Sequence, residues 1–162
     1  MFEVRNSATN LLVITRFLAK TIQSAAGTAQ DNSLDVFRDT VFSAVDTTST
    51  VTPTVVSKRT ATMAAAPGGL QVRGVTATGV AAGMTGGTRT PDAGPFCQHP
   101  ISVMAAVQYS SNVTDVTDDL HGTHPFVFAN NEGLEVQNRV LNVTSYGVMA
   151  YFDLSAAEVA AF

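Results

Sequence analysis

The alternation of apolar and polar residues with a period of two constrains this chain more than any other sequence feature. In the stretch "FEVRN", Phe2 and Val4 alternate with charged residues, while "TNLLVITRF" (residues 9–17) is a continuous apolar run rich in β-branched residues. Such patterns are typical of half-buried and fully buried strands. Glycine and proline separate the runs, so we predict one all-β domain, an antiparallel β-sandwich resembling a jelly roll, with little helix.

Two segments are ambiguous. The stretch "SLDVFRDTVFSAV" (residues 33–45) places apolar residues on one helical face, but its Val, Phe and Thr content favours a strand, which we predict. The last eight residues, "SAAEVAAF", fit a short helical turn begun by Ser155 as well as an extended tail. We expect the domain to span residues 1–162, with residues 1–6 and 155–162 as extended arms.

The chain is poor in charge. Only 14% of its 162 residues are charged and its net charge is −4, whereas about 25% is usual for a globular domain. A nucleic-acid groove needs clustered Lys and Arg, so none is expected. The apolar runs are too short to cross a membrane or to form a signal peptide. The single cysteine, Cys97, excludes an internal disulfide and fits synthesis in a reducing cytosol.

Two groups of side chains resemble metal sites, and we expect neither to bind an ion. The first combines one thiol with three imidazoles, at Cys97, His99, His121 and His124; structural zinc sites more often show two close pairs of ligands. The second comprises the carboxylates of Asp115, Asp118 and Asp119, which lack the spacing and glycine of a calcium loop. No G-x-S-x-G or phosphate-binding motif occurs, so we expect no enzyme activity and no cofactor.

The tetrad Asn130-Asn131-Glu132-Gly133 predicts a chain reversal, because Asn and Gly tolerate left-handed backbone conformations. The register after this turn would direct Leu134 and Val136 inward, and Glu135 and Gln137 outward. The stretch "LEVQN" that follows echoes "FEVRN" near the start of the chain, which indicates two strands in similar half-buried positions.

The segments "GTHPFVFANNEGLEVQN" and "VTSYGVMAYFDLSAAEV" resemble the C-terminal half of small β-sandwich structural proteins of tailed-phage virions. "MTGGTRTPDAGPF" is similar to the connection that precedes them, and "NLLVITRF" to the first core strand. The resemblance covers most of the chain through short motifs. The end of the chain, "AYFDLSAAEVAAF", is more apolar than the charged finish common in that group.

The resemblance implies a capsid decoration or cement protein, made in the host cytoplasm and carried on the capsid surface. It would bind the assembled major capsid protein and itself, most simply as a trimer at threefold junctions, and would contact neither nucleic acid nor membrane. A tail or head-to-tail connector component is the alternative, and a carbohydrate-binding adhesin is a third class. Candidate contact residues are apolar and mostly aromatic: Phe2, Val4, Phe96, Phe126, Phe128, Tyr151 and Phe162. We expect strand addition by a terminal arm, with the N-terminal arm preferred.

Overall fold

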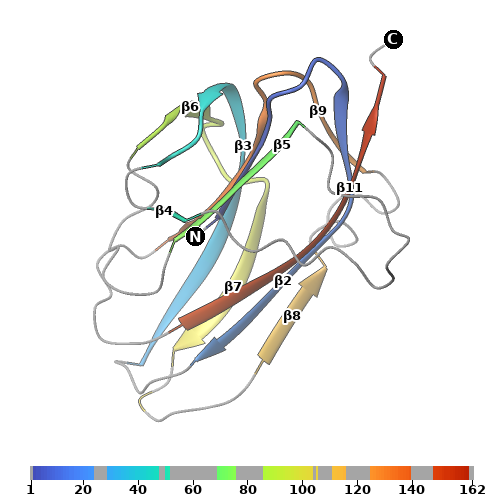
Figure 1. Ribbon diagram of the computed structural model, residues 1–162. Helices are drawn as coiled ribbons and strands as arrows, with labels where there is room; N and C mark the ends of the chain where they lie inside the picture. Colours follow the sequence, from blue (N-terminus) through green and yellow to red (C-terminus); the bar gives the residue numbers. More distant parts are fainter. Residues whose placement is uncertain are drawn as a thin grey trace.

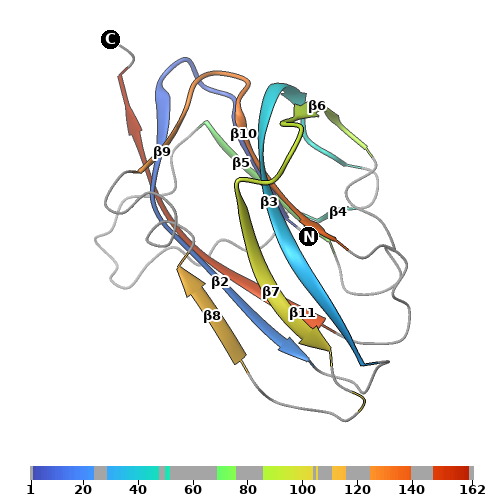
Figure 2. The same ribbon diagram turned by 180° about the vertical axis from the view of Figure 1, so that it is seen from behind.

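The protein folds into two antiparallel β-sheets packed face to face (Figures 1 and 2). This computed structural model describes residues 2–23, 29–47, 50–51, 69–75, 86–103, 105, 111–115, 125–139 and 148–160. No helix occurs in the described part of the chain. The predicted all-β sandwich is therefore confirmed.

Sheet A contains seven strands. Their order is β4 (Thr50–Val51), β5 (Leu70–Val75), β1 (Phe2–Asn6), β10 (Gly133–Asn138), β3 (Gln30–Ala44) and β6 (Thr88–Pro91), while β7 (Cys97–Val103) also pairs with β3. The long strand β3 makes this branching possible. One edge pairs with β10, and the other pairs with β7 over its first half and with β6 over its second.

Sheet B contains four strands. The order is β11 (Val148–Val159), β2 (Leu11–Gln23) and β8 (Ser111–Asp115), with β9 (Phe126–Phe128) pairing with β2 beyond the end of β8. Strand β11 pairs with β2 along its whole length, with one irregularity between Ser155 and Ala156. Among the described strands, β11 has no neighbour on its other side.

Apolar side chains from the facing surfaces of the two sheets form one core. Phe2 of β1 stacks on Phe17 of β2, with 6.3 Å between the ring centroids. The inward positions follow the alternation in the sequence, and the buried members are Phe2, Val4, Leu12, Ile14, Phe17, Ala19, Leu34, Val36, Cys97, Ile101, Phe128, Leu134 and Val136. Removal of this apolar surface from water is the main term that stabilises the sandwich.

The structure shows which secondary structure the two ambiguous segments adopt. Residues 33–44 lie in β3, which confirms the strand prediction. The C-terminal stretch continues β11 as far as Val159 and forms no helical turn there, while the final two residues lie outside the described part. The expected N-terminal arm is wrong, because β1 pairs with β10 on one side and β5 on the other. A strand whose backbone is bonded on both sides cannot add to a partner's sheet.

The predicted turn at residues 130–133 joins sheet B to sheet A. Asn131 adopts a φ of 60°, the left-handed conformation expected of this tetrad. The Asn131 amide donates to the Asn6 carbonyl, and the Asn6 amide donates to the Glu132 carbonyl, each at 2.9 Å. Gly133 serves a different purpose, since a Cβ built there would lie 2.0 Å from the Val4 carbonyl oxygen. The turn is thus bonded to the corner between β1 and β2.

Candidate functional site

A group of buried ionisable side chains lies on the face of sheet A that points away from the core. Glu3 and Glu135 occupy directly opposed positions in the β1–β10 ladder, and Asp39 lies on the next strand, opposite Gly133. Their exposed fractions are 0% for Glu3, 1% for Glu135 and 0% for Asp39. Like charges opposed across a ladder repel each other, so the carboxylates need compensation.

Arg89 of β6 supplies that compensation and is itself largely buried. Its Nε donates to Glu135 Oε2, and its Nη1 lies 3.4 Å from Glu3 Oε2. The same Nη1 donates to the Gly86 carbonyl at 2.7 Å, and the guanidinium carbon lies 5.9 Å from the ring centroid of Phe42. One guanidinium therefore bridges two carboxylates from adjacent strands above an aromatic ring.

A fourth carboxylate ties the loops at this end of the sheet to the cluster. The backbone amide of Asp46 donates to Glu3 Oε1 at 2.7 Å, and the Gly86 amide donates to Asp46 Oδ2 at 2.9 Å. Gly87 has a φ of 82° and a hypothetical Cβ there would lie 2.6 Å from the Ala44 carbonyl, so only glycine fits. We call Glu3, Asp39, Asp46, Arg89 and Glu135 the buried ionic cluster.

Asp39 differs from the other members because neither of its carboxylate oxygens has a hydrogen-bond partner among the described residues. Burial raises the pKa of Asp39 to about 8, and the nearby Glu135 charge adds to the effect, while Arg89 opposes it. Burial also raises the pKa of Glu3, against the opposing influences of the Asp46 amide and Arg89. Around neutral pH Asp39 therefore holds a proton, and the cluster binds protons more readily than exposed carboxylates do.

A bulge in β3 shapes this site. Val41 has a φ of 52°, which is unusual for a β-branched residue, and the β3–β6 register shifts between Thr40 and Ala44. Phe42 is consequently buried outside the main core, where its ring lies below Arg89. The Phe42 amide donates to the Asn131 carbonyl at 2.7 Å, which fixes the bulge against the turn.

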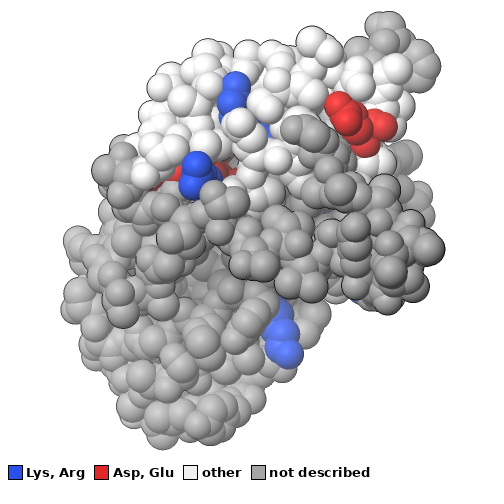
Figure 3. All heavy atoms as spheres, in the orientation of Figure 1, with Lys and Arg blue, Asp and Glu red and all other residues white. Residues whose placement is uncertain are grey.

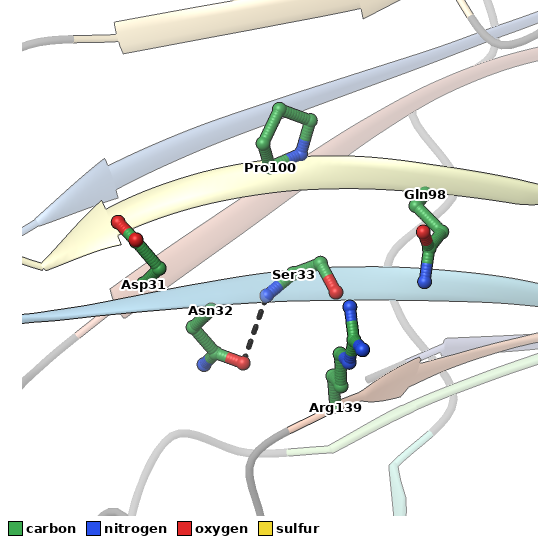
Figure 4. A pocket seen from close by; sticks show the side chains of 6 residues that line it. All are labelled: Asp31, Asn32, Ser33, Gln98, Pro100 and Arg139. Atoms are coloured by element: carbon green, nitrogen blue, oxygen red, sulfur yellow. Dashed lines mark hydrogen bonds between the residues drawn. The ribbon is translucent and has the colours of Figure 1, made fainter.

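A separate polar groove of about 500 Å³ crosses β3 and β7 (Figure 4). The side chains of Ser33 and Gln98 lie above that of Arg139, and the Ser33 hydroxyl donates to Asp35 at 2.6 Å. Among the described residues, those that line the groove are Asp31, Asn32, Ser33, Gln98, Pro100 and Arg139, and none of these is aromatic.

Sheet B carries an apolar patch on its outer face, beside the edge of β11 that pairs with no other described strand. Paired positions place five aliphatic side chains together on the outer face, which we call the outer apolar row: Leu11, Val13, Val127, Ala157 and Val159. Val127 is 50% exposed and Val159 is 40% exposed. Figure 3 shows that charged groups are few and scattered on the described part of one molecular face. The row offers an aliphatic contact surface, while exposed charged residues occur in the same strands, at Arg16 and Lys20 of β2 and at Glu158 of β11.

The structure brings few of the predicted contact residues to the surface. Phe2, Val4 and Phe128 are in the core, so their side chains are not available to a partner. Phe96 and Phe126 are partly buried and pack against each other with ring centroids 5.2 Å apart. The remaining two predictions lie outside what the structure describes, namely the side chain of Tyr151 and all of Phe162.

The candidate metal ligands are only partly described. Cys97 and His99 are buried in β7, where burial lowers the pKa of His99, and Asp115 ends β8. The described residues contain no group of three or more side chains suited to a metal ion. The other predicted ligands lie outside the described ranges: Asp118, Asp119, His121 and His124.

The alternation rule assigned the wrong environment to Glu135. Leu134 and Val136 point inward as predicted, but Glu135 is buried on the opposite face instead of facing solvent, and Glu3 is buried in the same way. The echo between "FEVRN" and "LEVQN" contained the missing signal, because these two stretches are the paired strands that oppose the two glutamates. No comparable signal indicated Asp39 or Arg89.

The described residues include no helix long and apolar enough to cross a membrane. We compared the chain with family models, with curated proteins and with solved structures. None of the three comparisons found a match.

Proposed function

We propose that this chain is a structural protein of a virus particle, and specifically a capsid decoration protein that binds assembled capsid subunits. The observation that carries the proposal is the twelve-residue edge strand β11 beside the outer apolar row. The low fraction of charged residues and the resemblance of the sequence motifs to tailed-phage virion proteins support the same proposal.

Proteins that act alone usually protect a sheet edge with charged side chains, especially lysine, with proline, or by keeping the edge strand short. The stretch Val148–Val159 contains neither Lys, Arg nor Pro, and its two charged residues are Asp153 and Glu158. The exposed residues near its C-terminal end are Ser155, Ala157, Glu158 and Val159. The one irregularity in its pairing with β2 lies between Ser155 and Ala156, and the residue left without a ladder partner is Thr15 of β2, so β11 itself carries no extra residue there. A strand from a neighbouring subunit would pair with β11 along the edge that no other described strand occupies, and would cover the aliphatic side chains next to it.

In this proposal the protein stabilises the assembled particle through mass action. A protein that binds the assembled shell but not free capsid subunits shifts the equilibrium toward the assembled shell. Contacts that are individually small then act over many symmetric copies. In this proposal the buried ionic cluster of sheet A stabilises the domain, while sheet B makes the contact.

The first experiment is quantitative mass spectrometry of purified particles from the phage that encodes the chain. A copy number comparable to that of the major capsid protein is expected for a decoration protein. A copy number equal to that of a single tail or portal ring would favour the connector alternative. Absence from purified particles would refute the structural role.

The second experiment tests the contact surface. Ala157→Lys and Val159→Lys place charges in the outer apolar row, and we expect each to reduce occupancy on capsids that lack the protein. Thr90→Lys in β6 is the matched control, because Thr90 is also an exposed strand residue but belongs to sheet A. If all three variants bind like the wild type, sheet B is not the contact surface.

A further inference from the structure

Asp39 of β3 lies beside β6, a strand of four residues at the edge of sheet A. In the ladder between β3 and β6 it pairs with Pro91, and its side chain is fully buried. Neither of its oxygens has a hydrogen-bond partner in the described part of the chain. An ionised carboxylate is poorly tolerated in such a place, whereas a protonated carboxyl loses much less solvation when it is buried. The protonated form of Asp39 is therefore favoured as long as β6 is paired with β3.

The charges that face Asp39 come from three strands. Glu135 on β10 and Glu3 on β1 are acidic, Arg89 on β6 is basic, and Asp92, just after β6, is acidic. Arg89 is already bonded to Glu135 and lies against Glu3. Loss of the proton from Asp39 would therefore add another buried negative charge around one guanidinium.

The two ends of β6 are held to sheet A in different ways. Arg89 joins one end to the ionic cluster, and the irregularity in the register with β3 lies toward that end, between Thr40 and Ala44. At the other end, the Asp92 amide donates to the Arg38 carbonyl at 2.9 Å, the Thr40 hydroxyl donates to the Thr90 carbonyl at 3.2 Å, and the exposed Arg38 and Asp92 side chains lie 3.7 Å apart. Pro91, at this end, is the ladder partner of Asp39. Separation of the Thr90–Asp92 end from β3 is therefore the movement that would bring water to the Asp39 carboxyl.

We propose that Asp39 and β6 form a proton-controlled latch, in which loss of the Asp39 proton opens the Thr90–Asp92 end of β6 and admits water to the carboxylate. In the closed state burial raises the pKa of Asp39 to about 8 from its ordinary value of 3.8. Between these two values, each pH unit favours the open form by up to about tenfold. Above pH 8 the effect levels off, because Asp39 is then ionised in both forms.

Hydrogen–deuterium exchange of the full chain tests the latch. Protection factors, corrected for the intrinsic exchange rate at each pH, are measured for the Asp92 amide and for the Phe96 amide between pH 5 and pH 9. The Phe96 amide donates to the Val36 carbonyl and serves as the internal control. We expect protection at Asp92 to fall by up to about tenfold per unit until pH 8, while protection at Phe96 stays nearly constant.

The variant Asp39→Asn keeps the shape of the side chain and cannot ionise. We expect its protection at Asp92 to be independent of pH. Equal pH profiles in the wild type and the variant would overturn the proposal, and so would a parallel loss at Asp92 and Phe96 in the wild type. If the variant fails to fold, ¹³C titration of the wild-type Asp39 carboxyl decides, because a midpoint near 4 would also overturn it.

Discussion

Replacement of Arg89 by Gln tests whether one guanidinium holds sheet A together at the ionic cluster. The Arg89 side chain is 9% exposed, and the Glu3 and Glu135 side chains that it bridges are 0% and 2% exposed. The variant removes the positive charge and leaves a shorter, uncharged polar side chain. Two opposed carboxylates then remain in a buried site without a counter-charge.

The expected loss is large. Removal of one partner from a buried ion pair typically costs about 3–5 kcal/mol, since the remaining charge keeps its desolvation penalty and loses its attraction. The total stability of a domain is about 5–15 kcal/mol, so Arg89→Gln should remove a substantial part of the free energy of unfolding. Two carboxylates contact the same guanidinium here, which places the expectation in the upper half of the range.

The loss should depend on pH with a definite sign. The pKa of Glu3 is already raised in the wild type although Arg89 lowers it, so the variant should raise it further. A carboxyl group with a raised pKa in the folded state loses stabilisation as pH rises above its unfolded value, here about 4.5. The variant should therefore approach wild-type stability near pH 4 and depart from it toward pH 7.

Urea unfolding followed by circular dichroism measures both effects. Arg38→Gln is the matched control, because Arg38 lies 3.7 Å from Asp92 and both side chains are half exposed. Such a surface pair contributes less than about 1 kcal/mol. A double variant with Arg89→Gln and Glu135→Gln should recover part of the loss. If Arg89→Gln and Arg38→Gln have the same stability at pH 7, the bridging role is refuted.

Three further predictions concern stability. Gly133→Ala should destabilise by at least about 2 kcal/mol in urea unfolding, because its Cβ would meet a backbone oxygen of β1 at 2.0 Å, whereas Gly74→Ala, with nothing within 4 Å, should be nearly neutral. Val41→Asn should stabilise by about 1 kcal/mol, because Asn tolerates the φ of 52° better than a β-branched residue, whereas Val127→Asn should not stabilise. Asp39→Asn should remove a pH dependence of up to about 5 kcal/mol: the raised pKa of Asp39 means that wild-type stability falls as pH rises from about 4 to 8. Equal slopes in this pH range would contradict the last expectation.

Local sequence patterns determined the class of the fold. Alternation and β-branched runs predicted strands at residues 2–6, 9–17 and 33–45, and the structure has β1, β2 and β3 at these places. The inward positions of Leu134 and Val136 follow from the same alternation. The turn before them was predictable because the backbone preferences of Asn and Gly are local properties.

Only the tertiary structure decided which strands pair with each other and which residues cover the outer face of sheet A. A period of two shows which residues share a face, but it does not show whether distant segments cover the second face. Glu3 and Glu135 appeared exposed for this reason, and they are buried because β6 brings Arg89 to them from a distant part of the sequence. The N-terminal segment likewise became an interior strand because β5 and β10, which follow much later in the chain, pair with its two edges.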